Sequence, residues 1–188
     1  MDATEVSAVL ARARQGDSDA FRTLVERHSR RAFQLAFRIT GNAQDAEDVV
    51  QESFIRAYRQ LSRFEARAHF ATWLHRIVAN CSVDLIRSRR ARYDHASTDD
   101  LAAADQPHTE APNPERLATS AQIQRTVASA MAELSPLERA AFTLRHYEGR
   151  SISEIGKTLG LGTSAAKHSV FRAVRKLRAA LEPLRSES

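Results

Sequence analysis

Residues 151–178 read SISEIGKTLGLGTSAAKHSVFRAVRKLR and contain three local signals in the order short helix, turn and long helix. Ser151 and Glu154 have the spacing of a capping box, which predicts that a short helix begins there. Gly160-Leu161-Gly162 predicts a tight turn, and Thr163 can cap a final, longer helix. This order of elements predicts a helix-turn-helix in the C-terminal part of the chain.

The final helix of this motif is expected to have two chemically different faces. Its apolar residues recur at helical spacing and should point inward: Ala166, Val170, Val174, Leu177 and Leu181. Its other face is basic, with one aromatic ring: Lys167, His168, Phe171, Arg172, Arg175 and Arg178. The second helix of a helix-turn-helix enters the major groove, where Arg and Lys can meet guanine edges or phosphates. The motif therefore favours duplex DNA binding over a merely solvated charged face.

Upstream of the motif, the sequence predicts two more helices of the same domain. Ser135-Pro136-Leu137-Glu138 is a second capping box, with proline at the first helical position. The helix before it should run from about Glu115 to Leu134. Its inward positions are expected to be Ile123, Val127, Met131 and Leu134. We therefore expect a C-terminal helical domain over residues 116–185.

Residues 93–115 differ in composition from everything around them. The stretch holds no Lys or Arg, and it contains six acidic residues and the prolines Pro107, Pro112 and Pro114. It has few large apolar residues, so it cannot bury enough surface to offset the entropy of ordering. The sequence predicts a flexible acidic linker between two domains.

Residues 1–92 have the pattern of a second helical domain. A short helix near residues 4–14 should precede three longer ones, the first beginning after Gly16-Asp17 and the second capped by Asn42. The second is expected to bury Val50, Phe54, Tyr58 and Leu61. The third is expected to bury Phe70, Trp73, Leu74, Ile77, Val78, Cys81 and Leu85. The fold class expected from these patterns is all-α, in two small domains.

The composition agrees with an all-α fold and narrows the choice of partners. Gly (6) and Pro (5) are scarce among 188 residues, and 43% of the residues are hydrophobic. The formal net charge of +5 favours an acidic partner such as nucleic acid. The single cysteine, Cys81, cannot form an internal disulfide, and we expect a cytoplasmic protein without an export signal or membrane span.

An acidic cluster lies at the start of the second long helix and consists of Asp45, Glu47, Asp48, Gln51 and Glu52. Acidic residues near a helix N-terminus interact favourably with the helix dipole, which accounts for Asp45 and in part for its neighbours. Asp48, Gln51 and Glu52 have i, i+3 and i+4 spacing and should share one outer face. Since acidic side chains repel DNA, this face predicts a basic protein partner.

Residues 61–70 mix basic and aromatic side chains, among them Arg63 and Phe64. Such mixtures bind single-stranded nucleic acid, because bases stack on rings and phosphates pair with arginine. An ordinary polar loop with one phenylalanine in the core explains the pattern equally well. Phe70 and Trp73 are better explained as core residues.

Two separate blocks resemble conserved segments of one family. Residues 45–54 read DAEDVVQESF and residues 70–80 read FATWLHRIVAN, which resembles region 2 of the extracytoplasmic-function (group IV) sigma factors. Residues 133–173 resemble their region 4. The resemblance covers nearly all of the chain except the linker. It implies a transcription initiation factor that binds core RNA polymerase, directs it to promoters and helps to melt DNA, in a stress or envelope response.

The resemblance also implies roles for individual residues. Five residues match the family's surface for the β′ coiled coil of core polymerase: Asp45, Glu47, Asp48, Gln51 and Glu52. Those expected at the minus-ten element and in melting are Arg63, Phe64, Asn80, Arg87 and Arg90. Those expected at the minus-thirty-five element are Arg145, Lys167, His168, Phe171, Arg172 and Arg175. Further implied partners are the β flap and an anti-sigma factor. The family commonly has Gly-Thr-Val where this chain has Ser164-Ala165-Ala166, so promoter preference does not carry over.

Two other classes of protein were weighed against this interpretation. A DNA-binding regulator with a helical sensor domain would share the helix-turn-helix but would need neither the acidic cluster nor the aromatic loop. An enzyme is disfavoured, because the sequence has no Walker loop, dinucleotide-binding turn or zinc-ligand spacing. His75 and Cys81 alone make no site. We therefore expect no catalytic residue, metal or cofactor, and the zinc signature of an anti-sigma factor is missing too.

Overall fold

The computed structural model describes residues 3–64, 69–95 and 114–186, and within them the chain is helical. The N-terminal elements are α1 (Ala3–Arg14), α2 (Ser18–Thr40), α3 (Ala43–Gln60), the 3₁₀ turn η1 (Leu61–Arg63) and α4 (Phe70–His95). The C-terminal elements are α5 (Pro114–Ala132), α6 (Pro136–His146), α7 (Ile152–Leu159) and α8 (Thr163–Ser186). Most of the predicted linker lies outside the described residues. Helix α4 passes the expected boundary at residue 92 by three residues.

The ends of the N-terminal helices follow the local signals in the sequence. Asp17 caps α2, and its Oδ1 accepts hydrogen bonds from the backbone N–H groups of residues 19 and 20, both at 3.0 Å. Gly41 ends α2 in the left-handed conformation, with φ of 76°, which glycine adopts without strain. Asn42 then caps α3 by accepting from the N–H of Asp45 at 2.9 Å. These caps confirm the predicted helix boundaries.

Helices α2, α3 and α4 pack against one another and enclose the N-terminal core. Its fully buried side chains include Leu24, Leu35, Ile39, Leu61, Leu74 and Val78. The expectation that Tyr58 is buried is wrong, because its side chain is 49% exposed. The inward stripe of α3 passes through Val49, Ser53, Ala57 and Leu61, at four-residue spacing, and leaves Tyr58 on its margin.

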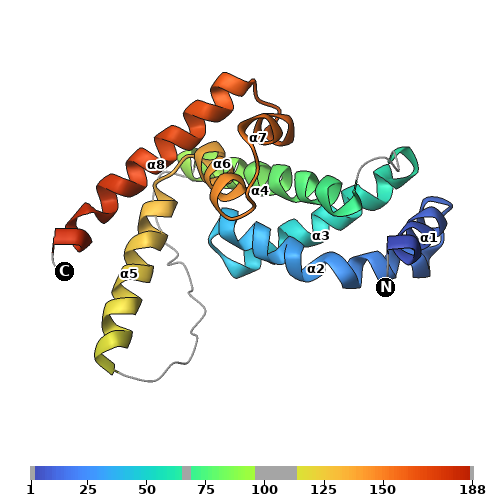
Figure 1. Cartoon of the computed structure of the whole chain (residues 1–188), viewed down its shortest axis with the longest axis horizontal. Coiled ribbons are helices and arrows are strands. Elements are labelled where there is room, and N and C mark those ends of the chain that lie inside the picture. The colour runs from blue at the N-terminus through green and yellow to red at the C-terminus, as the bar shows by residue number, and fades with distance from the viewer. Residues whose placement is uncertain (1–2, 65–68, 96–113, 187–188) are drawn as a thin grey trace.

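The C-terminal domain is built on the predicted helix-turn-helix. Ser135 and Glu138 form a complete capping box at the start of α6, and Ser151 and Glu154 form another at the start of α7. Gly160 ends α7 with φ of 65°. Helix α5 packs against α8, and its first part extends away from the other helices (Figure 1). The expectation that Ile123 points inward is therefore wrong, since the residue is 45% exposed.

The two domains contact each other in the structure. Helices α6 and α7 pack against α4, and α6 also contacts α2 (Figure 1). As a result, apolar residues of α6 and α7 such as Leu144 and Ile155 join the core cluster of the N-terminal domain. The helix-turn-helix is thus positioned against the N-terminal bundle, with α8 on its far side.

Candidate functional site

Helix α8 presents the basic face that the sequence predicts. Its inward residues are Ala166, Ser169, Ala173 and Leu177. Its exposed residues are Lys167, His168, Phe171, Arg172, Arg175 and Arg178. The Phe171 ring is 62% exposed, which is unusual for a large apolar side chain unless a partner covers it. The face therefore combines cations with one ring that can contact an apolar group, such as a thymine methyl.

One buried carboxylate organises the middle of this face. Glu138 of α6 is only 4% exposed, and its two oxygens contact Arg172 Nε at 3.2 Å and Lys176 Nζ at 2.8 Å. Burial on its own would raise the pKa of Glu138, but hydrogen bonds from Lys176 and from the Ser135 backbone hold it below its ordinary value. Glu138 is therefore ionised and restrains Arg172. Neither this restraint nor the part played by Lys176 was predicted from the sequence.

Arg145 lies in the last turn of α6, beside the turn that leads into α7. Its side chain is exposed, and Nη1 donates a hydrogen bond to the carbonyl of Arg150 at 3.0 Å. The contact orients Arg145 without neutralising it, because a carbonyl carries no full charge.

Asp45 does not belong to the exposed acidic face. It is 6% exposed and forms an ion pair with Arg89 of α4, so it ties the start of α3 to α4. Burial raises the pKa of Asp45, while the charge of Arg89 opposes that rise. Asp45 thus differs from its exposed neighbours in the cluster, because a residue distant in sequence covers its carboxylate.

The other four residues of the acidic cluster lie on two sides of α3. Glu47 and Gln51 face the groove between α2 and α3. Asp48 and Glu52 line a hollow of about 300 Å³ between α3 and α4. Glu52 accepts a hydrogen bond from Arg56 at 2.6 Å. The exposed ridge of α3 therefore has polar and acidic groups along both margins.

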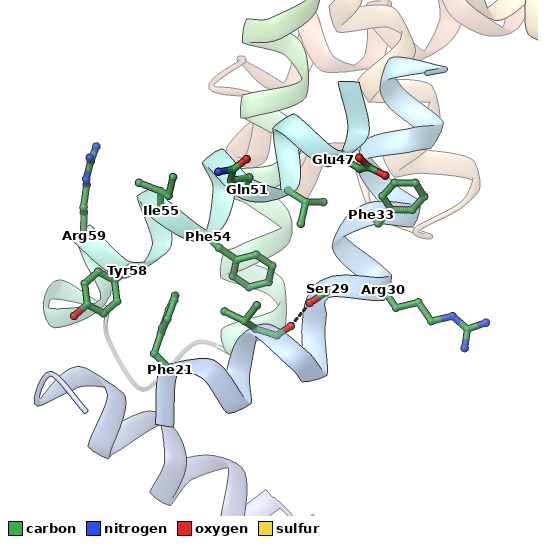
Figure 2. Close-up of a pocket in the computed structure, with 12 residues that line it drawn as sticks. Phe21, Ser29, Arg30, Phe33, Glu47, Gln51, Phe54, Ile55, Tyr58 and Arg59 are labelled. Atoms are coloured by element: carbon green, nitrogen blue, oxygen red, sulfur yellow. Dashed lines mark hydrogen bonds between the residues drawn. The ribbon is translucent and has the colours of Figure 1, made fainter. Parts of the chain in front are cut away.

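The groove beside α3 is large and mostly apolar, with a volume of about 960 Å³. Its apolar lining comes from Phe21, Val25, Phe33, Val50, Phe54, Ile55 and Tyr58. Figure 2 shows the rings of Phe21, Phe54 and Tyr58 turned toward the space between α2 and α3. Ser29, Arg30 and Arg59 complete the lining. The sequence analysis missed this groove, although Ile55 is an apolar residue on the polar outer face of the predicted helix.

The aromatic ring that precedes α4, Phe64, is buried, whereas a ring that stacks on bases must be exposed. Phe64 is 3% exposed, and its ring centroid lies 4.9 Å from that of Trp73 and 6.1 Å from that of Phe70. The structure therefore supports the core interpretation of this ring. Arg63 is exposed, and residues 65–68 lie outside the described residues.

Two of the residues expected at the minus-ten element make hydrogen bonds to the C-terminal domain. Asn80 Nδ2 donates to the carbonyl of Thr158 at 2.9 Å. Arg90 Nη2 donates to the carbonyls of Ala132 and Leu134 at 3.2 and 3.0 Å. Arg87, in contrast, is exposed. The five residues are thus not gathered on one free surface in this arrangement of the domains.

Comparison with known proteins gives the same assignment for both domains. Residues 24–92 match the family described as Sigma-70 region 2, and residues 124–177 match Sigma-70, region 4. The ECF RNA polymerase sigma factor SigW of Bacillus subtilis is 31% identical over 179 residues, which cover 93% of this chain and 96% of SigW. The chain belongs to the ECF RNA polymerase sigma factors.

Other relatives agree with this membership. The RNA polymerase sigma-H factor of Pseudomonas aeruginosa is 32% identical over 184 residues and covers 96% of this sigma factor. Among solved structures, CnrH in complex with the cytosolic domain of CnrY has a TM-score of 0.63 and 29% identity. The similarity covers 94% of this chain and 97% of CnrH. This sigma factor therefore binds core RNA polymerase and promoter DNA and directs promoter-specific initiation of transcription.

Three further observations concern the described part of this sigma factor. Its residues include no group of three or more His, Cys, Asp or Glu that could hold a metal ion. Among the same residues, no helix has the length and apolar character needed to cross a membrane. Cys81 is buried between α3 and α4, and burial raises the pKa of its thiol.

Proposed function

We propose that this sigma factor reads the minus-thirty-five element with the exposed face of α8. The observation that carries the proposal is the exposure of Lys167, His168 and Phe171 in the first turns of the recognition helix. Residues of these turns are the ones that a helix-turn-helix brings to base edges. Arg145 and Arg175 flank these residues, and we expect their guanidinium groups to bind DNA phosphates. Arg172 can take part while its Nε stays on Glu138, because its side chain is 55% exposed and the guanidinium has further donors.

Core polymerase is proposed to bind across the ridge of α3. Glu47, Asp48, Gln51 and Glu52 line its margins, and the apolar groove extends beside it. A basic helical partner, such as the β′ coiled coil, would place apolar side chains in the groove and cations against the acids. The exposed Ile55 and Tyr58 would then be covered, as is usual for apolar side chains at the centre of an interface. The β flap is proposed as a partner of region 4.

The minus-ten element is proposed to bind region 2 near the exposed Arg63 and Arg87. Asn80 and Arg90 can join them once they release region 4. Phe64 can stack on a base only if its ring leaves the cluster with Trp73, so its part in melting remains a prediction. No step of this function is enzymatic in our proposal, because binding and deformation of DNA are sufficient.

An anti-sigma factor is proposed as the regulator. Support comes from the relative CnrH, whose structure contains the cytosolic domain of CnrY, and from the large apolar groove of this chain. We propose further that the chain acts in the cytoplasm, where RNA polymerase is, and that it serves a stress or envelope response.

The experiment that tests this function is transcription in vitro with core polymerase and a library of genomic fragments. Adding the chain should produce transcripts whose upstream sequences share a minus-thirty-five element. The variant Lys167→Ala with Phe171→Ala should lose these transcripts while still binding core polymerase. Arg22→Ala removes an exposed cation of α2 and should behave like the wild type. If the chain produced no transcripts of its own, the proposed function would be wrong.

A further inference from the structure

Region 4 contains two capping boxes that have the same residue pattern but different surroundings. Ser135 and Glu138 form the box of α6, and Ser151 and Glu154 form that of α7. In each box the serine N–H donates to the glutamate Oε2, at 2.9 Å for Glu138 and 2.8 Å for Glu154. The side chain of Glu154 is 51% exposed, whereas that of Glu138 is 5% exposed. Capping alone therefore does not require the burial of Glu138.

The second difference between the two glutamates is a contact with the recognition helix. Glu138 Oε1 lies 3.2 Å from Arg172 Nε, and Oε2 accepts a hydrogen bond from Lys176 Nζ at 2.8 Å. Both cations belong to α8 and are one helical turn apart. Glu154 is paired instead with Arg150, just before its own helix. A buried carboxylate is unfavourable without such partners, so the two α8 cations stabilise Glu138 in its buried position.

The ion pair with Glu138 leaves most of the Arg172 guanidinium available. It involves Nε, the nitrogen nearest the main chain, while the two terminal nitrogens carry four further N–H donors. Arginine reads guanine by placing two donors on O6 and N7. A free arginine side chain loses rotamer freedom when it takes up this geometry, and a restrained one loses less. A contact at Nε can therefore orient Arg172 and still leave the donors that guanine needs.

From these contacts we propose that Glu138 is a positioning residue for promoter recognition. It holds Arg172 so that the terminal nitrogens of the guanidinium meet a guanine of the minus-thirty-five element. This inference rests on the proposed function, in which the exposed face of α8 enters the major groove. Lys176 binds the second oxygen and keeps the carboxylate in place. Specificity at one base pair thus depends on a residue that lies beneath α8 and does not itself touch DNA.

The test uses holoenzyme, made of core polymerase and the full chain, and a promoter recovered by transcription in vitro. The minus-thirty-five positions of this promoter are randomised, and the bound duplexes are sequenced. Arg172→Ala should remove the preference for guanine at one position. Glu138→Gln should lower the guanine preference at the same position at least about fivefold. Glutamine keeps the hydrogen bonds of the capping box, so this variant removes only the negative charge.

A matched change in the other capping box is the control. Glu154→Gln removes the same charge from region 4 and should keep the base preferences of the wild type. Each variant gains one unit of positive charge, which can only strengthen non-specific attraction to DNA. Weaker binding confined to guanine-containing sequences therefore cannot be a general charge effect. If Glu138→Gln changed the affinity for all sequences alike, or left the guanine preference unchanged, the positioning role would be overturned.

A double-mutant cycle determines whether Glu138 acts through Arg172. In the Arg172→Ala background, Glu138→Gln should change the base preferences no further. An additional loss there, or a guanine preference that survives Arg172→Ala, would contradict the inference. Chemical denaturation shows whether each variant is folded, and the ratio of affinities for two bases does not depend on the fraction of active protein. If wild-type holoenzyme selected no minus-thirty-five sequence at all, the proposed function itself would fail. Selection of guanine by both the wild type and Glu138→Gln would count against the positioning role alone.

Discussion

Helices α3 and α8 invite comparison, because each buries one face and offers the other to a partner. On α3 the outer face is acidic at its margins and borders an apolar groove. On α8 the outer face is cationic, with one exposed ring. The inner faces of both helices pack against neighbouring helices. The chemistry of the outer face is what separates a helix suited to a basic protein from one suited to DNA.

The largest effect is expected from reversing the charge of α3. Asp48→Arg with Glu52→Arg should reduce affinity for core polymerase by at least about a hundredfold, because like charges at an interface cost several kcal/mol. The loss of the exposed Glu52–Arg56 pair should change the stability of the fold little. A pull-down and a titration by fluorescence anisotropy measure the effect.

A matched reversal controls for net charge. Glu26→Arg with Glu133→Arg changes two exposed acids outside the α3 ridge and should leave the affinity for core polymerase within about threefold. Equal losses in both double variants would show that total charge, not the α3 surface, determines polymerase binding.

The next effect concerns the stability of region 4, which contains α8, and leaves α3 unchanged. A Cβ atom added at Gly156 of α7 would lie 2.8 Å from the carbonyl oxygen of Leu161, which is backbone and cannot move aside cheaply. Gly156→Ala should therefore destabilise region 4 by about 2 kcal/mol, although alanine is the better helix former. A Cβ at Gly162 meets nothing within 4 Å, so Gly162→Ala is the control. Chemical denaturation measures both, and equal stabilities would contradict the close approach.

A smaller effect should divide α8 itself. Lys167→Ala should cost about 1–3 kcal/mol on some promoter sequences and little on others, if Lys167 meets a base edge. Arg178→Ala, farther along the helix, should weaken all sequences alike and reduce the salt slope by about one unit. Binding of holoenzyme to single-base promoter variants at two salt concentrations distinguishes these outcomes. Uniform loss for Lys167→Ala would assign it to phosphate.

The smallest effect concerns pH. Burial lowers the pKa of His75 below its ordinary value of 6.5, with Arg150 and Arg31 adding to the shift and Glu148 opposing it. Because the pKa of His75 is lower in the folded chain, folding favours the neutral imidazole. The contribution of His75 to the stability of the fold is therefore full above pH 6.5 and is lost as the pH falls below 6.5. His28 shifts the same way. Thermal melts from pH 7.5 to 5.5 should therefore show a modest decrease, and His75→Gln should reduce it.

Local signals in the sequence were sufficient for the helix boundaries and for the outer face of α8. Ser135, Ser151 and Asn42 cap helices because their partners lie three residues away. Contacts between distant residues were beyond such reasoning. Nothing local indicates that Asp45 meets Arg89, or that Arg172 meets Glu138.

The same limit explains the errors in burial. Helical periodicity predicts that one face is apolar, but the neighbouring helices determine how wide the covered stripe is. Tyr58 lies beyond the edge of that stripe, and Ile123 lies on a helix that few others contact. The packing of region 4 on region 2 includes hydrogen bonds from Arg139 to the carbonyls of Ile39 and Thr40, which no pattern along the chain reveals.

Glu138 has a consequence for the thermodynamics of promoter binding. Arg172 and Lys176 already have an anion of their own in the free chain. If either side chain moves to a DNA phosphate, DNA releases a condensed cation, but the exposed carboxylate attracts one in return. The net ion release should therefore be lower than the number of phosphate contacts suggests. Region 4 would then keep more of its DNA affinity when the ionic strength rises. Osmotic shock is one condition in which the ionic strength rises.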